Sequence, residues 1–361
     1  MVTLHRQNAG SLVDLPLHEA ADDTATCAPP TRLTGASGVT TAAYESSTTP
    51  VSRLPDLARP GTMRAAMCHE PVHERTSATV NIKSPLSHRA DGTTTMTLSV
   101  TADDPLFSEE VVTGLTKDHL VRLATGTLAC VHARAFLPAE LRADLAGLVD
   151  RMPLSSVNSK RVNPPVLRFG PTVNDFVADG QLDPGYWTHV ESARTAWAAA
   201  DLDPDPLRIC LEGLGEVWGG PPEAARIAGR PVMAGTIRES NGGLRVHFDD
   251  VAREFPRGLF DQKLVAQLAI NVYLMMPSVG GETTIWRRTW EPTDEAARIG
   301  FGYDSEVVAG VQSVTVRPEP GDALVFNPRF YHSVAGGQDG RRVSVAMFIG
   351  ITTGGNLAIW S

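Results

Sequence analysis

Residues 320–344 read PGDALVFNPRFYHSVAGGQDGRRVS. The stretch begins with a Pro-Gly turn that leads into an apolar run, which is typical of a buried β-strand. His332 follows after a short loop, and Arg342-Val343-Ser344 opens another predicted strand ten residues later. Alternation along that strand places Arg342 and Ser344 on one face. A guanidinium makes paired hydrogen bonds with a carboxylate, and a serine hydroxyl can donate a third. The stretch therefore predicts a carboxylate clamp close to a histidine.

A second motif, His247-Phe248-Asp249, lies upstream at the end of a predicted strand. Alternation turns His247 and Asp249 to the same face. With ten histidines and 41 acidic residues among 361, about one His-x-Asp/Glu triplet is expected by chance, and residues 189–191 form a second one in a helix-like segment. The specificity comes from the combination with His332, because two imidazoles and one carboxylate are the ligands of mononuclear non-haem iron(II). We predict that His247, Asp249 and His332 bind iron and form the catalytic centre.

The apolar pattern divides the rest of the chain into helices followed by strands. Helical spacing predicts helices over 105–125, 138–151, 191–200 and 205–218, with a strand over 127–136. Further strands, bounded by Gly and Pro turns, are expected over 232–239, 244–248, 265–275, 283–286, 311–316, 323–326 and 343–351. This order predicts an α+β, mainly β fold in which a double-sheet barrel is braced by N-terminal helices.

Residues 1–95 differ in composition from the rest of the chain. They are rich in Thr, Ser, Ala and Pro and sustain no apolar pattern, so they are predicted to be a disordered extension. Met96 stands just before the first periodic sequence, and whether the extension belongs to the native protein stays open. The folded domain is predicted to span 96–361.

Composition limits the classes of function. A chain with 42% hydrophobic and 20% charged residues is typical of globular proteins. A net charge of −9 without a basic stripe argues against nucleic acid or an anionic membrane as partner. The sequence has no apolar run of the length that predicts a transmembrane helix. Its N-terminus lacks the basic region followed by an apolar stretch that would predict a secretory signal. Four scattered cysteines without a C-x-x-C motif fit a reducing compartment. We expect a cytoplasmic protein that acts on a small molecule, with a homodimer left open.

From about residue 230 to the C-terminus the chain resembles the double-stranded β-helix (jelly-roll, cupin-like) core of Fe(II)/2-oxoglutarate-dependent dioxygenases. The resemblance rests on the order H-x-D, distal His and R-x-S, and on the hairpin 280–284 (GGETT). More narrowly, residues 245–250 (RVHFDD) and 281–286 (GETTIW) resemble a bacterial group acting on free amino acids or close derivatives, which contains hydroxylases, halogenases and oxidative cyclases. The resemblance implies iron(II), O2 and 2-oxoglutarate, with the distal carboxylate of 2-oxoglutarate on Arg342 and Ser344.

Asp249 separates the reactions within this group. The halogenases carry Gly or Ala at that position, which frees a metal site for chloride. The resemblance therefore implies hydroxylation of an unactivated C–H in a free amino acid or an amino-acid-derived molecule of secondary metabolism. Oxidative cyclisation or desaturation with the same cofactors stays open. From other classes, a non-redox cupin-like binding protein would make Arg342-x-Ser344 a coincidence, and a zinc hydrolase would need a general base that no obvious motif supplies.

Seven further residues are weaker candidates for the site. Thr284 and Trp286 share a strand face and are expected to line the co-substrate pocket, with core packing as the alternative. The predicted substrate-binding residues are Asp250 for an ammonium, Arg168 for a carboxylate, and Arg238, Asn241 and Trp360. A surface or packing role is the alternative for each of them.

Overall fold

The structure, a computed structural model, describes residues 103–156, 162 and 164–361. The predictions of a disordered segment over 1–95 and of a native start at Met96 lie outside these residues. The described part is mainly β-sheet: one sheet has ten strands, a second has four, and three pairs of short strands stand apart. This agrees with the predicted mainly β class and is consistent with a jelly-roll.

The two sheets collect strands that lie far apart in the sequence. The ten-stranded sheet has the order β1 (Glu109–Val112), β2 (Cys130–Ala133), β17 (Ala323–Phe326), β12 (Leu264–Met275), β19 (Val343–Thr352), β10 (Thr236–Glu239), β4 (Leu167–Phe169) and β3 (Ser155–Ser156), with β20 (Leu357–Trp360) on β19 and β7 (Glu223–Ala224) on β20. The four-stranded sheet has the order β11 (Leu244–His247), β18 (Phe330–Val334), β13 (Thr283–Thr289) and β16 (Ser313–Val316). The short pairs are β5 (Val177–Ala178) with β6 (Gln181–Leu182), β8 (Arg226–Ile227) with β9 (Arg230–Pro231), and β14 (Arg298–Ile299) with β15 (Gly302–Tyr303).

The described α-helices are α1 (Lys117–Ala124), α2 (Ala139–Val149), α3 (Gly185–Ala200), α4 (Pro206–Trp218) and the single turn α5 (Val251–Glu254), with 3-10 turns at Val173–Phe176, Pro292–Ala297 and Ser305–Val308. Local sequence explains where α4 starts and stops. The Asp205 side chain accepts hydrogen bonds from the first turn, and Gly219, at φ +84°, ends the helix in the left-handed region. No helix of the described residues is long and apolar enough to cross a membrane.

The predicted helix over 105–125 was wrong in its first half. Residues Glu109–Val112 form β1, which pairs in parallel with β2, and the helix begins only after Thr116. There the Thr116 side chain accepts from the backbone N–H of His119, and the His119 ring accepts from the backbone N–H of Thr116. This reciprocal cap starts the helix at residue 117. The other predicted helices and strands are present with shifted ends. Among the strands, β18, β20 and the short strands β3 to β9, β14 and β15 were not predicted.

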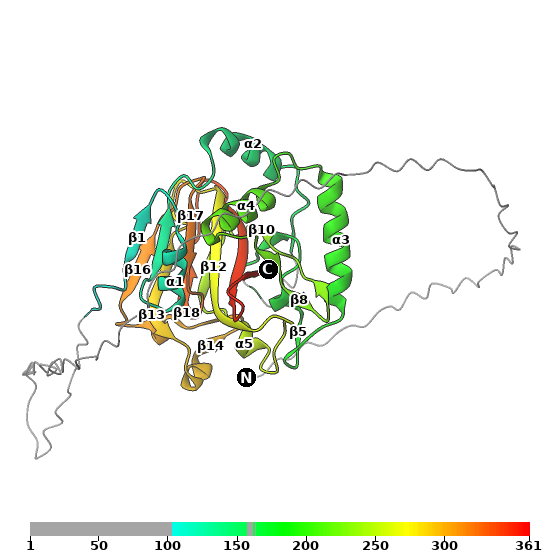
Figure 1. Cartoon of the computed structure of the whole chain (residues 1–361). Helices are drawn as coiled ribbons and strands as arrows, with labels where there is room; N and C mark the ends of the chain where they lie inside the picture. The colour runs from blue at the N-terminus through cyan, green and yellow to red at the C-terminus, as the bar shows by residue number, and fades with distance from the viewer. Residues whose placement is uncertain (1–102, 157–161, 163) are drawn as a thin grey trace, which may run out of the picture. The chain divides into compact units, whose positions relative to one another are not determined.

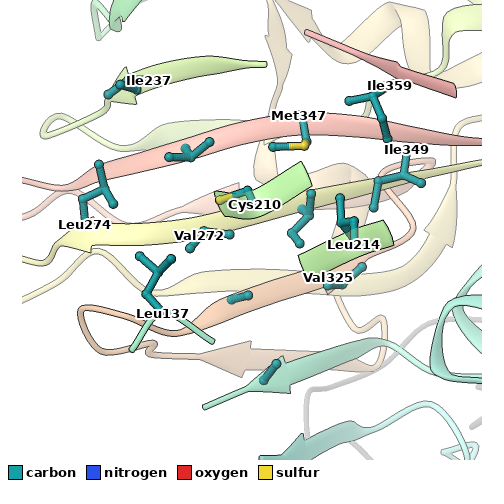
Figure 2. Packing of buried hydrophobic residues seen from close by; sticks show 14 of the residues in the cluster. Leu137, Cys210, Leu214, Ile237, Val272, Leu274, Val325, Met347, Ile349 and Ile359 are labelled. Atoms are coloured by element: carbon teal, nitrogen blue, oxygen red, sulfur yellow. The ribbon is translucent and has the colours of Figure 1, made fainter. Parts of the chain in front are cut away.

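The two faces of the ten-stranded sheet have different neighbours. On one face, alternate residues such as Val272 and Ile349 pack with Cys210 and Leu214 of α4 (Figure 2). Figure 1 shows α1, α2 and α4 along this side of the sheet. The opposite face carries Tyr273 and packs with residues of the four-stranded sheet. Because β12 and β19 are covered on both faces, their sequences are mostly apolar. The space between the two sheets is where polar side chains gather.

Candidate metal centre and co-substrate site

His247, Asp249 and His332 meet at the pairing of β11 and β18. The two strands run antiparallel with His247 directly opposite His332, and the imidazole centroids are 4.2 Å apart. Asp249 follows β11, and its backbone N–H donates to the carbonyl of Pro328 at 2.9 Å. Asp249 Oδ2 lies 3.6 Å from His332 Nε2 and 4.0 Å from His247 Nε2. One ligand atom of each residue lies within 4.8 Å of the other two. Two imidazole nitrogens and one carboxylate oxygen fit iron(II) in type and number.

Both imidazoles are oriented by their own strands. His247 Nδ1 lies 2.7 Å from the carbonyl of Arg245, and His332 Nδ1 lies 2.9 Å from the carbonyl of Phe330. A carbonyl only accepts, so each Nδ1 carries the proton and donates it. Each Nε2 lone pair is then directed at the centre, which is the usual arrangement of metal-binding histidines.

The electrostatics keep the three side chains ready to bind a cation. Burial, helped by the neighbouring His332, lowers the pKa of His247 to about 4, so its imidazole is neutral at physiological pH. Burial alone would raise the pKa of Asp249. The nearby imidazoles of His332 and His247 and the cation Arg238 outweigh burial and lower that pKa to about 2. Neutral imidazoles and an ionised carboxylate are the forms that bind metal.

Arg342 is a buried cation with neutral partners. It is 3% exposed, and its Nε donates to the carbonyl of Gly281 at 3.0 Å. Its terminal nitrogens donate to Ser240 Oγ at 2.9 Å, Tyr273 OH at 3.2 Å and Thr283 Oγ1 at 3.1 Å. Among the described residues it forms no ion pair with a carboxylate. A buried guanidinium without a counter-ion favours an anion beside it, and the distal carboxylate of 2-oxoglutarate fits that requirement.

The neighbouring Arg341 points elsewhere. It makes a paired contact with Glu239, at 3.1 and 2.7 Å, and a further one with Asp150 at 2.6 Å. Ser344, in contrast, is 1% exposed, and its Oγ has no hydrogen-bond partner among the described residues. A buried hydroxyl in this state is available to a ligand. Its predicted contact with 2-oxoglutarate stays a prediction.

Two adjoining cavities open at the metal centre. The first is lined by the three predicted metal ligands, by Arg342, Thr283 and Arg238, and by mainly apolar residues. The second shares His247, Asp249 and Arg238 with the first and extends to a separate set of side chains, which includes Arg168, Thr172, Asn174, Asp175 and Phe301. Arg342 lines the first cavity and not the second, so an anion bound to Arg342 would leave the second cavity open.

The predicted roles of Thr284 and Trp286 were wrong by one residue. Ile285 lies opposite His332, so alternation turns Thr283 and Ile285 inward and their neighbours outward. Thr284 Oγ1 instead lies 2.9 Å from Thr315 Oγ1, and Trp286 packs in an outer apolar cluster. Thr283 is the residue that contacts Arg342.

Three predicted substrate residues line neither cavity. Asp250 caps α5 and pairs with Arg329 Nε at 3.0 Å. The side-chain oxygen of Asn241 accepts from the backbone N–H of Arg342 at 2.8 Å, so Asn241 positions the clamp rather than a substrate. Trp360 is fully buried and packs on Phe348, which corresponds to the packing alternative. Arg168 and Arg238 do line the second cavity.

Sequence reasoning also missed residues that complete the site. Tyr273 and Ser240 bind the Arg342 guanidinium, and Phe301 lines the second cavity. Tyr273 lies within a predicted strand, so its alternation with buried neighbours was a usable signal. Ser240 and Phe301 follow strand ends, and nothing in their local sequence indicated the contact.

The fold and the site together define the class of Fe(II)/2-oxoglutarate-dependent dioxygenases, whose cofactors are iron(II), 2-oxoglutarate and O2. The chain belongs to this superfamily. It is 43% identical over 249 residues to the L-gamma-glutamyl-L-propargylglycine hydroxylase of Streptantibioticus cattleyicolor, covering 68% of this chain and 93% of that protein. No family model matches the chain.

Two other proteins show a more distant similarity to this chain. Leucinostatins biosynthesis cluster protein S of Purpureocillium lilacinum is 28% identical over 131 residues, which cover 35% of this chain and 53% of that protein. The crystal structure of an N-substituted L-amino acid dioxygenase from Burkholderia ambifaria with bound alpha-KG aligns with a TM-score of 0.46 at 12% identity, over 68% of this chain and 90% of that one.

Proposed function

We propose that this dioxygenase hydroxylates an unactivated C–H of a free amino acid or of an amino-acid-derived small molecule, with L-γ-glutamyl-L-propargylglycine as the first substrate to test. The observation that carries the proposal is the 43% identity, over nearly the whole length of the relative, to a hydroxylase of that dipeptide. Asp249 supports it, because a carboxylate beside the two histidines occupies the metal position that a halide would need.

Five polar side chains at or beside the first cavity have proposed roles. His247, Asp249 and His332 bind the iron, while Arg342 and Ser344 bind the distal carboxylate of 2-oxoglutarate. Bound iron with 2-oxoglutarate and O2 supplies the oxidising chemistry, and succinate and CO2 are released. The protein holds the imidazoles through their Nδ1 hydrogen bonds and fixes the guanidinium from several sides. It also surrounds the centre with apolar side chains such as Phe326 and Phe348, which limit access of water.

We also propose that the two sheets form a double-stranded β-helix that is braced by α1, α2 and α4, and that the oxygenase domain spans 96–361. Location in the cytoplasm stays a prediction from composition.

The test is an incubation of the purified protein with Fe(II), 2-oxoglutarate, air and the dipeptide. The expected result is succinate release that depends on the dipeptide, with a product heavier by one oxygen atom. Asp249→Ala and His332→Ala are the inactive controls, and Arg208→Gln, on the exposed side of α4, is the matched active control. No dipeptide-dependent succinate would overturn this choice of substrate.

The mass of the product separates the remaining reactions of the class. A loss of two hydrogens indicates desaturation or oxidative cyclisation, for which the same cofactors suffice. A gain of chlorine in the presence of chloride would contradict the role of Asp249. Membership of the dioxygenase superfamily leaves the non-redox cupin-like alternative without support.

A further inference from the structure

Arg238 stands at the junction of the two cavities, and none of the described carboxylates forms an ion pair with it. It lies on β10 and lines both cavities. Its Nε is buried without a hydrogen-bond acceptor, and the described residues offer it no carboxylate within ion-pair distance. Leaving a guanidinium in this state is costly, because a charge taken out of water needs a partner.

The neighbours of Arg238 in the sheet increase that cost. In the register of the ten-stranded sheet, Arg168 of β4 lies directly opposite Arg238 on one side and Ser344 of β19 on the other. Like charges at directly opposite positions destabilise a sheet. Burial and the nearby Arg168 lower the pKa of Arg238 to about 10. A buried charge with a shifted pKa at a cavity wall is typical of a functional site.

The carboxylates nearby are already engaged. Asp175 pairs with Arg168 and accepts from Thr172 Oγ1 at 2.9 Å. Asp249 is directed at the two histidines. Among the described residues, Asp175 and Asp249 could therefore pair with Arg238 only by breaking another contact.

A count of formal charges isolates the same residue. The two positive charges of iron(II) are balanced by Asp249 and one carboxylate of 2-oxoglutarate, and Arg342 balances the other carboxylate. Arg168 and Asp175 balance each other. Among the described residues at the two cavities, the positive charge of Arg238 is then left over, and it lies where the second cavity begins.

We propose that Arg238 binds a free carboxylate of the substrate in the second cavity, and that it thereby selects acids over their amides and esters. This inference rests on the proposed function, because it assigns a substrate to that same site. The substrate must then carry a free carboxylate near the carbon that is oxidised. Both groups must fit between the metal centre and Arg168.

The test crosses a change in the protein with a change in the ligand. Protein loaded with Fe(II) and 2-oxoglutarate, without O2, is titrated calorimetrically with L-γ-glutamyl-L-propargylglycine and with its two single carboxamides. One carboxamide is expected to bind wild-type protein about 10- to 100-fold more weakly, the loss of a charged hydrogen bond. In Arg238→Gln that difference should shrink to about twofold or less, and Arg238→Lys should retain part of it. Arg208→Gln is the control and should behave as wild type.

The outcomes separate this inference from its alternative. If Arg238→Gln weakens the binding of 2-oxoglutarate to the iron-loaded protein instead, and the carboxamide difference persists, Arg238 belongs to the co-substrate and the inference is overturned. If the difference persists with unchanged 2-oxoglutarate binding, Arg238 contacts neither ligand, and the inference is overturned as well.

A second readout does not depend on the dipeptide. Arg238→Gln is expected to raise the unfolding temperature of the ligand-free protein, since it removes a cation without a partner. A lower unfolding temperature would mean that the protein already compensates the charge, which overturns the inference. The proposed function fails separately, if wild-type protein releases no succinate with the dipeptide.

Discussion

Arg342→Gln tests the co-substrate site most directly, because the residue is held on every side. Its four side-chain hydrogen bonds go to neutral oxygens of Gly281, Ser240, Tyr273 and Thr283. These contacts fix the plane of the guanidinium without neutralising it. The charge is therefore available to a ligand, and its removal should affect ligand binding more than folding.

The expected magnitude follows from the contacts that would be lost. Four of the five N–H groups of Arg342 are engaged with protein oxygens, which leaves one for the carboxylate. A charge-assisted hydrogen bond contributes about 1.5–3 kcal/mol, which corresponds to an increase of roughly 10- to 100-fold in the KM for 2-oxoglutarate. Arg342→Lys keeps a positive charge but lacks the planar fork, so its increase should be smaller than that of Arg342→Gln.

The assay is a titration of 2-oxoglutarate with succinate as the product measured, at saturating Fe(II) and substrate. Arg341→Gln is the matched control, because this adjacent arginine pairs with Glu239 and Asp150 away from the cavity. It should leave the KM within about threefold of wild type, as expected for a partly exposed ion pair. Thermal unfolding checks that each variant is folded. A KM that rises for Arg341→Gln and not for Arg342→Gln would refute the assignment.

Three further predictions concern the same centre. Asp249→Ala should abolish hydroxylation and weaken metal binding, measured by product mass and by metal titration; undiminished hydroxylation would remove Asp249 from the centre. Thr283→Val should raise the KM for 2-oxoglutarate by about 2- to 10-fold, because Arg342 loses one of the four hydrogen bonds that position it, whereas Thr284→Val should not, and the opposite ranking would refute the register. In the metal-free protein the pKa of His247 is lowered from 6.5 to about 4, so the folded state binds fewer protons than the unfolded state between these values. The free energy of unfolding, measured with urea, should therefore fall as the pH falls from 6.5 to 4. In His247→Gln this free energy should depend less on pH.

The sequence predicted the parts of the molecule that depend on local patterns. The long apolar runs of β12 and β19 and the turns at Gly and Pro located most strands, because a strand covered on both faces cannot hide its composition. The metal ligands were predicted from a motif. A His-x-Asp pair and a later histidine, followed by Arg342-x-Ser344, form a pattern whose chemistry leaves few alternatives.

The errors came from contacts between segments that are distant in the sequence. Residues 105–112 have helical spacing, yet β1 forms because β2 offers a parallel edge. Asp250 was predicted to bind an ammonium, but the fold places Arg329 beside it and the two side chains form an ion pair. In both cases the partner lies outside any window in which propensity operates, so tertiary pairing overrides the local preference.

The misassignment on β13 has a more specific cause. Strand alternation predicts two faces but not which of them is inner, and a shift of one residue exchanges every side chain. The pairing of Ile285 with His332 across β13 and β18 decides it, and β18 is a strand that the local sequence pattern did not predict. Once β18 is recognised as a strand, His332 lies on the inner face with Ile285, and Thr283 follows by alternation. The same reasoning applied to β10 turns Arg238 inward beside Ser344. The register of the two sheets, more than any single motif, therefore decides which polar residues reach the metal centre.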